Sequence, residues 1–295
     1  MALQGGSSGR LPGHPPSDLF SASMTDLRPL RTLAALLLVL CSGTVLAACG
    51  SDDDSSASTP ASTGAASSSR RVVVSGATSL TKALTAYGDA FTGGEVKASF
   101  AGSDELAAQI RQGVKPDVFA SANTKLPDAL FAEGLVEQPV VFATNSLVLA
   151  VPADDAEVDA IDDLAAKGTT IAIGAEGVPV GDSTRKVLDA LPAAQAKAIL
   201  GNVRSNEPDV GGVVGKIAQG AVDAGFVYAS DVQGSEGKVR AIDLPADLEP
   251  TVQYGVAIVK GAKNPAGARA FVDGLLRGPG AEALKAAGFG APPAR

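Results

Sequence analysis

The sequence is short of the side chains on which many enzymes depend. It holds one histidine (His14), two cysteines (Cys41 and Cys49) and no tryptophan, and aromatic residues make up 4% of its 295 residues. Basic residues are also scarce, since 24 Lys and Arg stand against 32 Asp and Glu, for a net charge of -8. A surface that binds nucleic acid needs clustered Lys and Arg, so we expect no nucleic-acid partner. Hydrophobic residues make up 45% of the chain, which is enough for one large or two modest domains.

The N-terminal segment has the layout of a secretory signal peptide. Arg28 and Arg31 precede an apolar run, Leu33 to Leu46, which small residues follow. A positively charged start, an apolar segment too short for a comfortable membrane span and small residues before a cleavage site are typical of such a signal. The tetrapeptide Leu46-Ala47-Ala48-Cys49 resembles the lipobox of bacterial lipoproteins, which implies cleavage after residue 48 and a lipid anchor on Cys49. A plain signal peptide with an incidental cysteine is the alternative.

Removal of residues 1–48 would change the chemistry available to the rest of the chain. It takes away His14 and Cys41, together with three basic and two acidic residues, so the remainder stays acidic. A chain without histidine or a free thiol cannot form a Ser-His-Asp triad, a cysteine nucleophile or a His/Cys zinc site. We therefore expect a protein that is not an enzyme. Residues 1–23 lack the order of a signal, and Met24 is a second candidate for the start.

Ordered structure is expected to begin at Arg71, after a flexible tether over residues 49–70 that is almost entirely Ser, Asp, Ala, Thr and Gly. From there, short apolar segments alternate with longer segments of helical pattern, which predicts an α/β fold with parallel sheets covered on both faces. Strands are expected at 71–75, 95–100, 117–120, 147–151, 170–173, 225–229, 238–242 and 252–259. Helices are expected at 80–91, 104–112, 126–133, 161–166, 182–191, 192–200 and 210–219, with two more from Pro265 and Pro279.

Four of the expected helices begin beside hydroxyl groups or glycine-containing turns. Residues 75–79 and 100–103 lead from strands into helices and contain Ser79 and Ser103, and residues 177–181 and 207–211 precede two further helices. The first backbone N–H groups of a helix lack intrahelical partners and attract negative charge. If the fold brings these four helix starts together, they form a site for a small anion. Each serine alone is equally well explained as a helix cap.

Six short motifs follow one another in an order that characterises one family. They are Ala77-Thr78-Ser79-Leu80-Thr81, Phe100-Ala101-Gly102-Ser103 with Leu106-Ala107-Ala108-Gln109-Ile110, Pro116-Asp117-Val118-Phe119-Ala120-Ser121-Ala122, Asn145-Ser146-Leu147-Val148-Leu149, Val178-Pro179-Val180-Gly181 and Gly225-Phe226-Val227-Tyr228-Ala229-Ser230-Asp231. In this arrangement the chain resembles the molybdate-binding proteins of ABC transporters. The likeness runs from about Arg71 to Phe289.

The resemblance implies a set of ligand-binding residues, which surround an oxyanion without any basic side chain. The implied donors are the hydroxyl groups of Ser79, Ser103 and Tyr228 and the backbone amides of Val180 and Val210. Relatives commonly have Ala at the Val180 position, a change that a main-chain donor tolerates. Within the first motif, Ser79 is better placed for function than Thr78 or Thr81. Taken alone, Tyr228 could be a core aromatic residue at the end of a buried strand.

The resemblance also implies a type II periplasmic-binding-protein-like fold, with the ligand cleft between two lobes joined by crossing strands. Lobe one is expected over 71–144 plus 255–290 and would carry Ser79 and Ser103. Lobe two is expected over 145–254 and would carry the other three donors. Closure of the cleft on the ligand would create the form that an ABC permease in the membrane recognises. We expect a monomer on the extracytoplasmic side, with no cofactor and no metal beyond the oxyanion.

The chemistry of the donors favours one class of anion. A site with donors and no acceptors prefers a fully deprotonated tetrahedral anion, so we expect molybdate or tungstate rather than monohydrogen phosphate, with sulfate excluded by its smaller size. A carrier of another oxyanion or solute, such as sulfate, phosphate or a metal chelate, is the alternative. A serine hydrolase is a more distant one, because residues 49–295 contain neither a Gly-x-Ser-x-Gly motif nor a histidine base. The run from Gly211 to Lys216 has the wrong glycine spacing for a phosphate-binding loop, and Ile217 replaces its Ser or Thr.

Two features depart from the family pattern. Asp104 and Glu105 directly follow Ser103, and carboxylates so near a dianion would be repulsive unless they point outward. Both also suit the first turn of a helix electrostatically, and this structural role is the one we expect. The helix after Val210 contains three glycines, which lowers its helix propensity and predicts a looser start.

Overall fold

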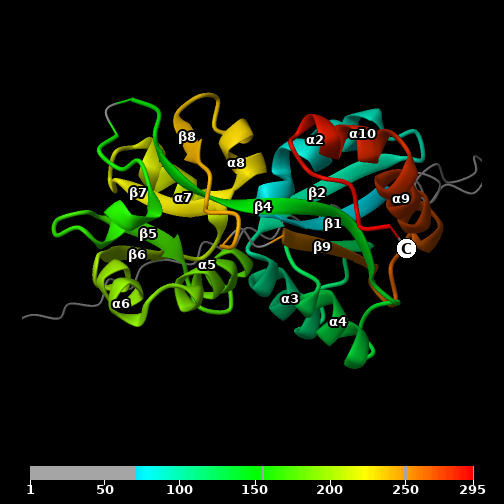
Figure 1. Ribbon diagram of the computed structural model, residues 1–295. Helices are drawn as coiled ribbons and strands as arrows, with labels where there is room; N and C mark the ends of the chain where they lie inside the picture. The colour runs from blue at the N-terminus through cyan, green and yellow to red at the C-terminus, as the bar shows by residue number, and fades with distance from the viewer. Residues whose placement is uncertain (1–70, 155, 249–250, 295) are drawn as a thin grey trace, which may run out of the picture. The chain divides into compact units, whose positions relative to one another are not determined.

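The computed structural model describes residues 71–154, 156–248 and 251–294 (Figure 1). The signal peptide, the lipobox with Cys49 and the tether predicted for residues 1–70 lie outside these ranges. The described residues alternate strands and helices along the chain. The predicted α/β class is confirmed.

Nine strands pair into one continuous network with the order β2-β1-β3-β9-β4-β7-β5-β6, and β8 pairs with β4 beside this path. The strands are β1 (Arg71–Ala77), β2 (Glu95–Ala101), β3 (Val118–Ser121), β4 (Val140–Pro152), β5 (Ile171–Gly174), β6 (Val203–Glu207), β7 (Ala224–Tyr228), β8 (Val239–Ile242) and β9 (Thr251–Ile258). β1 lies in parallel between β2 and β3, and β5 lies in parallel between β6 and β7. Each parallel group forms the centre of one lobe.

The long strand β4 joins the two lobes (Figure 1). Its first half, from Val140 to Ser146, pairs antiparallel with β9. Its second half, from Leu147 to Pro152, pairs antiparallel with β7 and β8. The strand therefore passes from one sheet to the other near Ser146, which is the crossing expected of a two-lobed binding protein.

Helices cover both faces of the sheets and place their apolar sides in two buried clusters. They are η1 (Thr78–Leu80), α2 (Thr81–Ala90), α3 (Ser103–Arg111), α4 (Lys125–Ala132), η2 (Ile161–Ala165), α5 (Pro179–Ala190), α6 (Ala193–Gly201), α7 (Val210–Ala218), α8 (Ala229–Gly234), α9 (Pro265–Arg277) and α10 (Pro279–Ala286). On β3, Val118 belongs to the cluster that includes Tyr87 of α2 and Phe271 of α9, whereas Phe119 belongs to the cluster of α3 and α4. Neighbouring strand residues point to opposite faces, so one strand anchors both layers. None of the helices in these ranges is both long enough and apolar enough to cross a membrane.

The elements differ most from the predicted ones at β4 and β6, and in addition α8 was not predicted and η2 is a 3-10 helix. β4 begins at Val140 rather than at residue 147, because the whole joining strand is paired, first with β9 and then with β7. β6 was not predicted at all. It lies at the edge of its sheet with alternating exposure, and its sequence, Val-Arg-Ser-Asn-Glu, holds a single apolar residue from which a strand could be recognised.

Candidate ligand-binding site

A small cavity lies between the two lobes, where the ends of β1, β2 and β7 meet the starts of α3, α5 and α7. All five residues predicted to hold the ligand line it, namely Ser79, Ser103, Val180, Val210 and Tyr228. Its volume is about 20 Å³, compared with the roughly 10–15 Å³ that one water molecule needs. A space of this size suits a small ion rather than a metabolite-sized molecule.

Ser103 is the first residue of α3 and has 2% of its surface exposed. Its Oγ accepts a hydrogen bond of 3.1 Å from the backbone N–H of Ala122, which lies just after β3. A hydroxyl group has one proton and two lone pairs, so this contact leaves the Ser103 proton available. Ser103 makes no side-chain cap of its own helix, contrary to the simplest structural explanation of a serine at this position.

Ser79 belongs to a chain of buried hydrogen bonds that starts at the joining strand. Asn145 of β4 receives the Ser146 N–H on its Oδ1 at 3.0 Å, which orients its Nδ2 toward Tyr254 of β9 at 3.4 Å and Ser230 of α8 at 2.8 Å. Tyr254 Oη in turn lies 3.0 Å from Ser79 Oγ. Either hydroxyl can be the donor in this contact. When Tyr254 donates, the Ser79 proton is free for the cavity.

Two helix starts in lobe two supply backbone donors. Val180 is the second residue of α5, behind Pro179, and Val210 is the first residue of α7. Backbone N–H groups in the first turn of a helix have no intrahelical acceptor, and the helix dipole favours negative charge there. The loose start predicted for α7 is not observed, because Asp209 caps the helix by accepting the Gly212 N–H at 3.0 Å.

Tyr228 ends β7 and is 1% exposed. Its hydroxyl makes no hydrogen bond within the described residues, although Ser183 approaches it without regular hydrogen-bond geometry. Burial, followed by the negative charge of Asp231, raises the pKa of this phenol far above its ordinary value. Tyr228 is therefore a neutral O–H donor without an acceptor, beside a cavity of ionic size.

The sequence pattern favours Ser79 over Thr78 as a functional residue, yet Thr78 also lines the cavity. Its Oγ1 is buried and, like the Tyr228 hydroxyl, has no hydrogen-bond partner among the described residues. The sequence could not distinguish the two neighbours, because either hydroxyl can face the cavity depending on the turn that follows β1.

The acidic side chains near the site differ in how deeply they are buried. Glu105 is exposed and accepts from Gln109, as expected for a carboxylate that points outward. Asp104 differs, because its Oδ1 is buried without a partner and burial raises its pKa, with Glu105 and Asp182 adding to the effect. Asp209 lines the cavity itself, a feature that the sequence analysis missed. Within the described ranges, no group of three His, Cys, Asp or Glu side chains is arranged to hold a metal ion.

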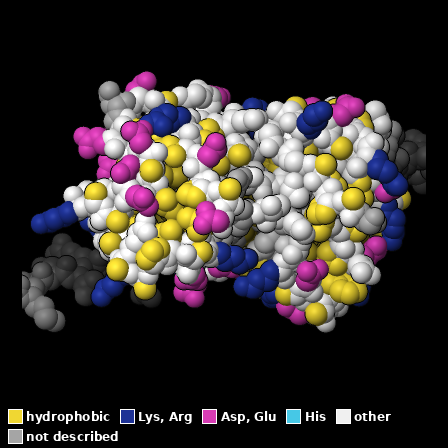
Figure 2. All heavy atoms as spheres, in the orientation of Figure 1, with side chains coloured by type: hydrophobic (Ala, Val, Ile, Leu, Met, Phe, Trp, Pro, Cys, Tyr) yellow, Lys and Arg dark blue, Asp and Glu magenta, His cyan; other side chains and the backbone are white. Residues whose placement is uncertain are grey.

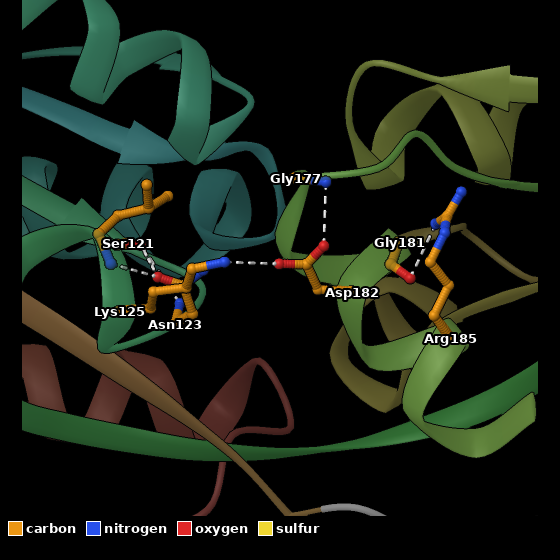
Figure 3. Close-up of polar contacts among 8 residues, drawn as sticks. Ser121, Asn123, Lys125, Gly177, Gly181, Asp182 and Arg185 are labelled. Atoms are coloured by element: carbon orange, nitrogen blue, oxygen red, sulfur yellow. Dashed lines mark hydrogen bonds and ion pairs between the residues drawn. The ribbon is translucent and has the colours of Figure 1, made fainter. Parts of the chain in front are cut away.

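Contacts across the cleft hold the lobes together around the cavity. Lys125 of α4 reaches Asp182 of α5, with Nζ 3.4 Å from Oδ2, while Asp182 Oδ1 accepts the Gly177 N–H at 2.9 Å (Figure 3). Gly102 approaches lobe two so closely that a Cβ there would lie 2.6 Å from Pro208 O.

On the face shown in Figure 2, the Lys and Arg side chains of the described residues are dispersed rather than gathered in one patch.

Comparison with known proteins agrees with this geometry. Residues 72–290 match the family model described as bacterial extracellular solute-binding protein. The chain belongs to this family. It is 36% identical over 225 residues to the molybdate-binding protein ModA of Mycobacterium tuberculosis, covering 74% of this chain and 84% of the relative. The corresponding values for ModA of Escherichia coli are 31% over 229 residues, 73% and 87%.

Among solved structures, the periplasmic molybdate-binding protein of Azotobacter vinelandii superposes with a TM-score of 0.68 at 26% identity, covering 75% of this chain and 100% of that one. The resemblance predicted from the six motifs is confirmed by these relatives. The type II binding-protein fold is confirmed as well.

Proposed function

We propose that the protein binds molybdate or tungstate in the cavity between its lobes and delivers it to an ABC permease. The observation that carries this proposal is the convergence of Ser79, Ser103, Val180, Val210 and Tyr228 on one cavity of about 20 Å³. The names of the relatives from M. tuberculosis, E. coli and A. vinelandii support the same ligand.

The proposed ligand set consists of neutral donors. The hydroxyl proton of Ser103 is left free by the bond that its oxygen accepts, Ser79 can donate to the anion while it accepts from Tyr254, and Tyr228 has a proton without an acceptor among the described residues. Hydrogen bonds to a charged partner contribute about 1.5–3 kcal/mol each, so several such donors can replace the hydration of a dianion without a basic side chain. An oxyanion that carries no proton uses every donor.

One observation favours a second candidate, monohydrogen phosphate. Asp209 lines the cavity, and a carboxylate can accept the proton that this anion carries. Against it, Asp209 Oδ1 is engaged in capping α7, and a carboxylate beside an unprotonated dianion is repulsive. The Asp209→Asn variant separates the two candidates, because it replaces the charged acceptor for phosphate with a weaker neutral one and removes the charge repulsion for molybdate.

The family and the signal peptide predicted from the sequence support a proposal for the location and the working cycle. We infer that Cys49 carries a lipid anchor on the extracytoplasmic side, that residues 49–70 act as a tether and that the protein is a monomer without enzymatic activity. Lobe one would comprise 71–144 plus 255–290, and lobe two 145–254. Donors from both lobes would contact one anion in this arrangement, so binding would favour the closed form over the open one, and the permease would recognise the closed form.

A thermal-shift panel of the purified protein with molybdate, tungstate, sulfate, phosphate and nitrate tests the proposal. A ligand at 100 times its Kd adds about 2.7 kcal/mol to the free energy of unfolding, which is a shift of several degrees in Tm. We expect shifts with molybdate and tungstate only, reduced in Ser79→Ala and unchanged in the exposed control Thr85→Val. A shift with phosphate that Asp209→Asn reduces would instead support the second candidate, and no shift with any anion would refute both.

A further inference from the structure

Thr78 occupies the turn between β1 and α2 as the first residue of η1. Two contacts fix the orientation of this residue. Its backbone oxygen accepts a hydrogen bond of 2.6 Å from Thr81 Oγ1. Its methyl group lies against α7 of the opposite lobe, where a Cβ built on Gly211 would come within 2.8 Å of Thr78 Cγ2. The side chain is thus in contact with lobe two.

The remaining group of this side chain, the hydroxyl, has no partner. Thr78 Oγ1 is buried, lines the cavity and makes no hydrogen bond with any described residue. A buried hydroxyl without a hydrogen bond is unfavourable, and most such groups in folded proteins find a partner. Among the described residues, the space beside Thr78 that can hold such a partner is the cavity also lined by Ser79, Ser103 and Tyr228.

We propose that the Thr78 hydroxyl donates a hydrogen bond to the bound oxyanion, as a further donor beside Ser79, Ser103 and Tyr228. This inference rests on the proposed function and adds to it a specificity-determining residue. Thr78 would then have three roles. Its hydroxyl binds the anion, its methyl group packs on α7, and its backbone oxygen holds the turn. An additional donor raises the preference for an anion without protons, because each proton on the ligand would leave one donor unused.

Two substitutions separate the contribution of the Thr78 hydroxyl to binding from that of its methyl group. Thr78→Val keeps the shape and removes the donor, whereas Thr78→Ser keeps the donor and removes the methyl group. Thr85→Val, on the exposed side of α2, is the matched control for loss of a threonine hydroxyl. Titration calorimetry with molybdate and with tungstate gives the affinity of each variant, and the Tm of the ligand-free protein reports on folding.

We expect Thr78→Val to weaken binding by about tenfold or more, the effect of one hydrogen bond to a charged group, without lowering the ligand-free Tm. Thr78→Ser should retain most of the affinity, and Thr85→Val should match the wild type. Wild-type affinity in Thr78→Val, or equal losses in Thr78→Val and Thr78→Ser, would overturn the inference while leaving the proposed function intact. A wild-type protein that binds neither anion would overturn the proposed function and this inference with it.

Discussion

Ser79 Oγ and Tyr254 Oη lie 3.0 Å apart, although 175 residues separate them along the chain. The contact places a residue of β9 directly behind a hydroxyl that lines the cavity. Tyr254 is fully buried, and its ring meets the Tyr228 ring edge-on with centroids 5.8 Å apart. The donor set is therefore supported by a second layer of aromatic residues on the strands at the centre of the molecule.

Tyr254→Phe tests whether this second layer directs the Ser79 proton. The substitution removes the hydroxyl that lies 3.0 Å from Ser79 Oγ, so the Ser79 hydroxyl is no longer held in place by Tyr254. We expect weaker molybdate binding, by less than the loss in Ser79→Ala, measured by titration calorimetry. In the double variant Ser79→Ala/Tyr254→Phe the two losses should be smaller than additive, since the residues share one hydrogen bond. Full additivity would show that the Tyr254 hydroxyl does not act through Ser79.

Tyr228→Phe removes a donor that has no protein partner. The loss should weaken molybdate binding by about 1.5–3 kcal/mol, or roughly 10- to 150-fold in Kd. Stability should not fall with it, because the hydroxyl makes no hydrogen bond in the described structure. Calorimetric titration and thermal denaturation of the same sample check both halves. A large drop in ligand-free Tm with unchanged affinity would assign Tyr228 to the core instead.

Gly102→Ala tests closure of the lobes. A Cβ at this position would lie 2.6 Å from Pro208 O, a backbone atom of the other lobe, so the closed arrangement cannot form without a shift. We expect molybdate binding to be weakened while the ligand-free protein still folds.

Gly215→Ala on α7 is the matched control for that substitution, because a Cβ there meets nothing within 4 Å. Replacing a helical glycine by alanine should add up to about 1 kcal/mol of stability and leave affinity unchanged. If Gly102→Ala bound molybdate as tightly as Gly215→Ala, close approach of the lobes at Gly102 would have no part in binding.

Asp231 predicts a pH dependence of stability. Burial raises the pKa of this carboxyl from 3.8 to about 7, the Tyr228 N–H opposes the rise, and Asp209 adds to it. Between these two values the folded protein holds a proton that the unfolded chain has lost. The contribution of Asp231 is thus present in full below pH 3.8 and is lost as the pH rises to about 7.

Asp231→Asn removes this titration and can keep the hydrogen bond from the Tyr228 N–H through its amide oxygen. We expect Tm to fall less steeply across that pH range in the variant than in the wild type. Thermal denaturation at a series of pH values measures the difference. Parallel curves for the two proteins would show that Asp231 does not titrate there.

The sequence predicts residues that line the cavity, but it does not predict the hydrogen bonds and turns that arrange them. The set of Ser79, Ser103, Val180, Val210 and Tyr228 came from the resemblance to the molybdate-binding family, whereas the pattern of strand ends and helix starts by itself indicated only four candidate anion-binding turns. Thr78 and Asp209 were missed because their position in the cavity depends on the rotation of a turn and on a cap. Tyr254 was missed because its contact with Ser79 crosses 175 residues and leaves no local pattern.

The fold shows the same division. Apolar strands such as β1 and β7 were predicted because burial on both faces makes them continuously hydrophobic. β6 was missed because an edge strand with one apolar residue follows from its neighbours rather than from its own composition. The first half of β4 was missed for a related reason, since its pairing with β9 joins segments more than 100 residues apart in the sequence.

The central claim is that the cavity binds a tetrahedral oxyanion without protons through neutral donors from both lobes. Competition calorimetry tests it most directly, with molybdate titrated into the wild-type protein and into Asp209→Asn, each in the absence and presence of excess phosphate. The account predicts tight molybdate binding that phosphate does not displace, with equal or higher affinity in Asp209→Asn. Displacement of molybdate by phosphate in the wild type, weaker in Asp209→Asn, would contradict it.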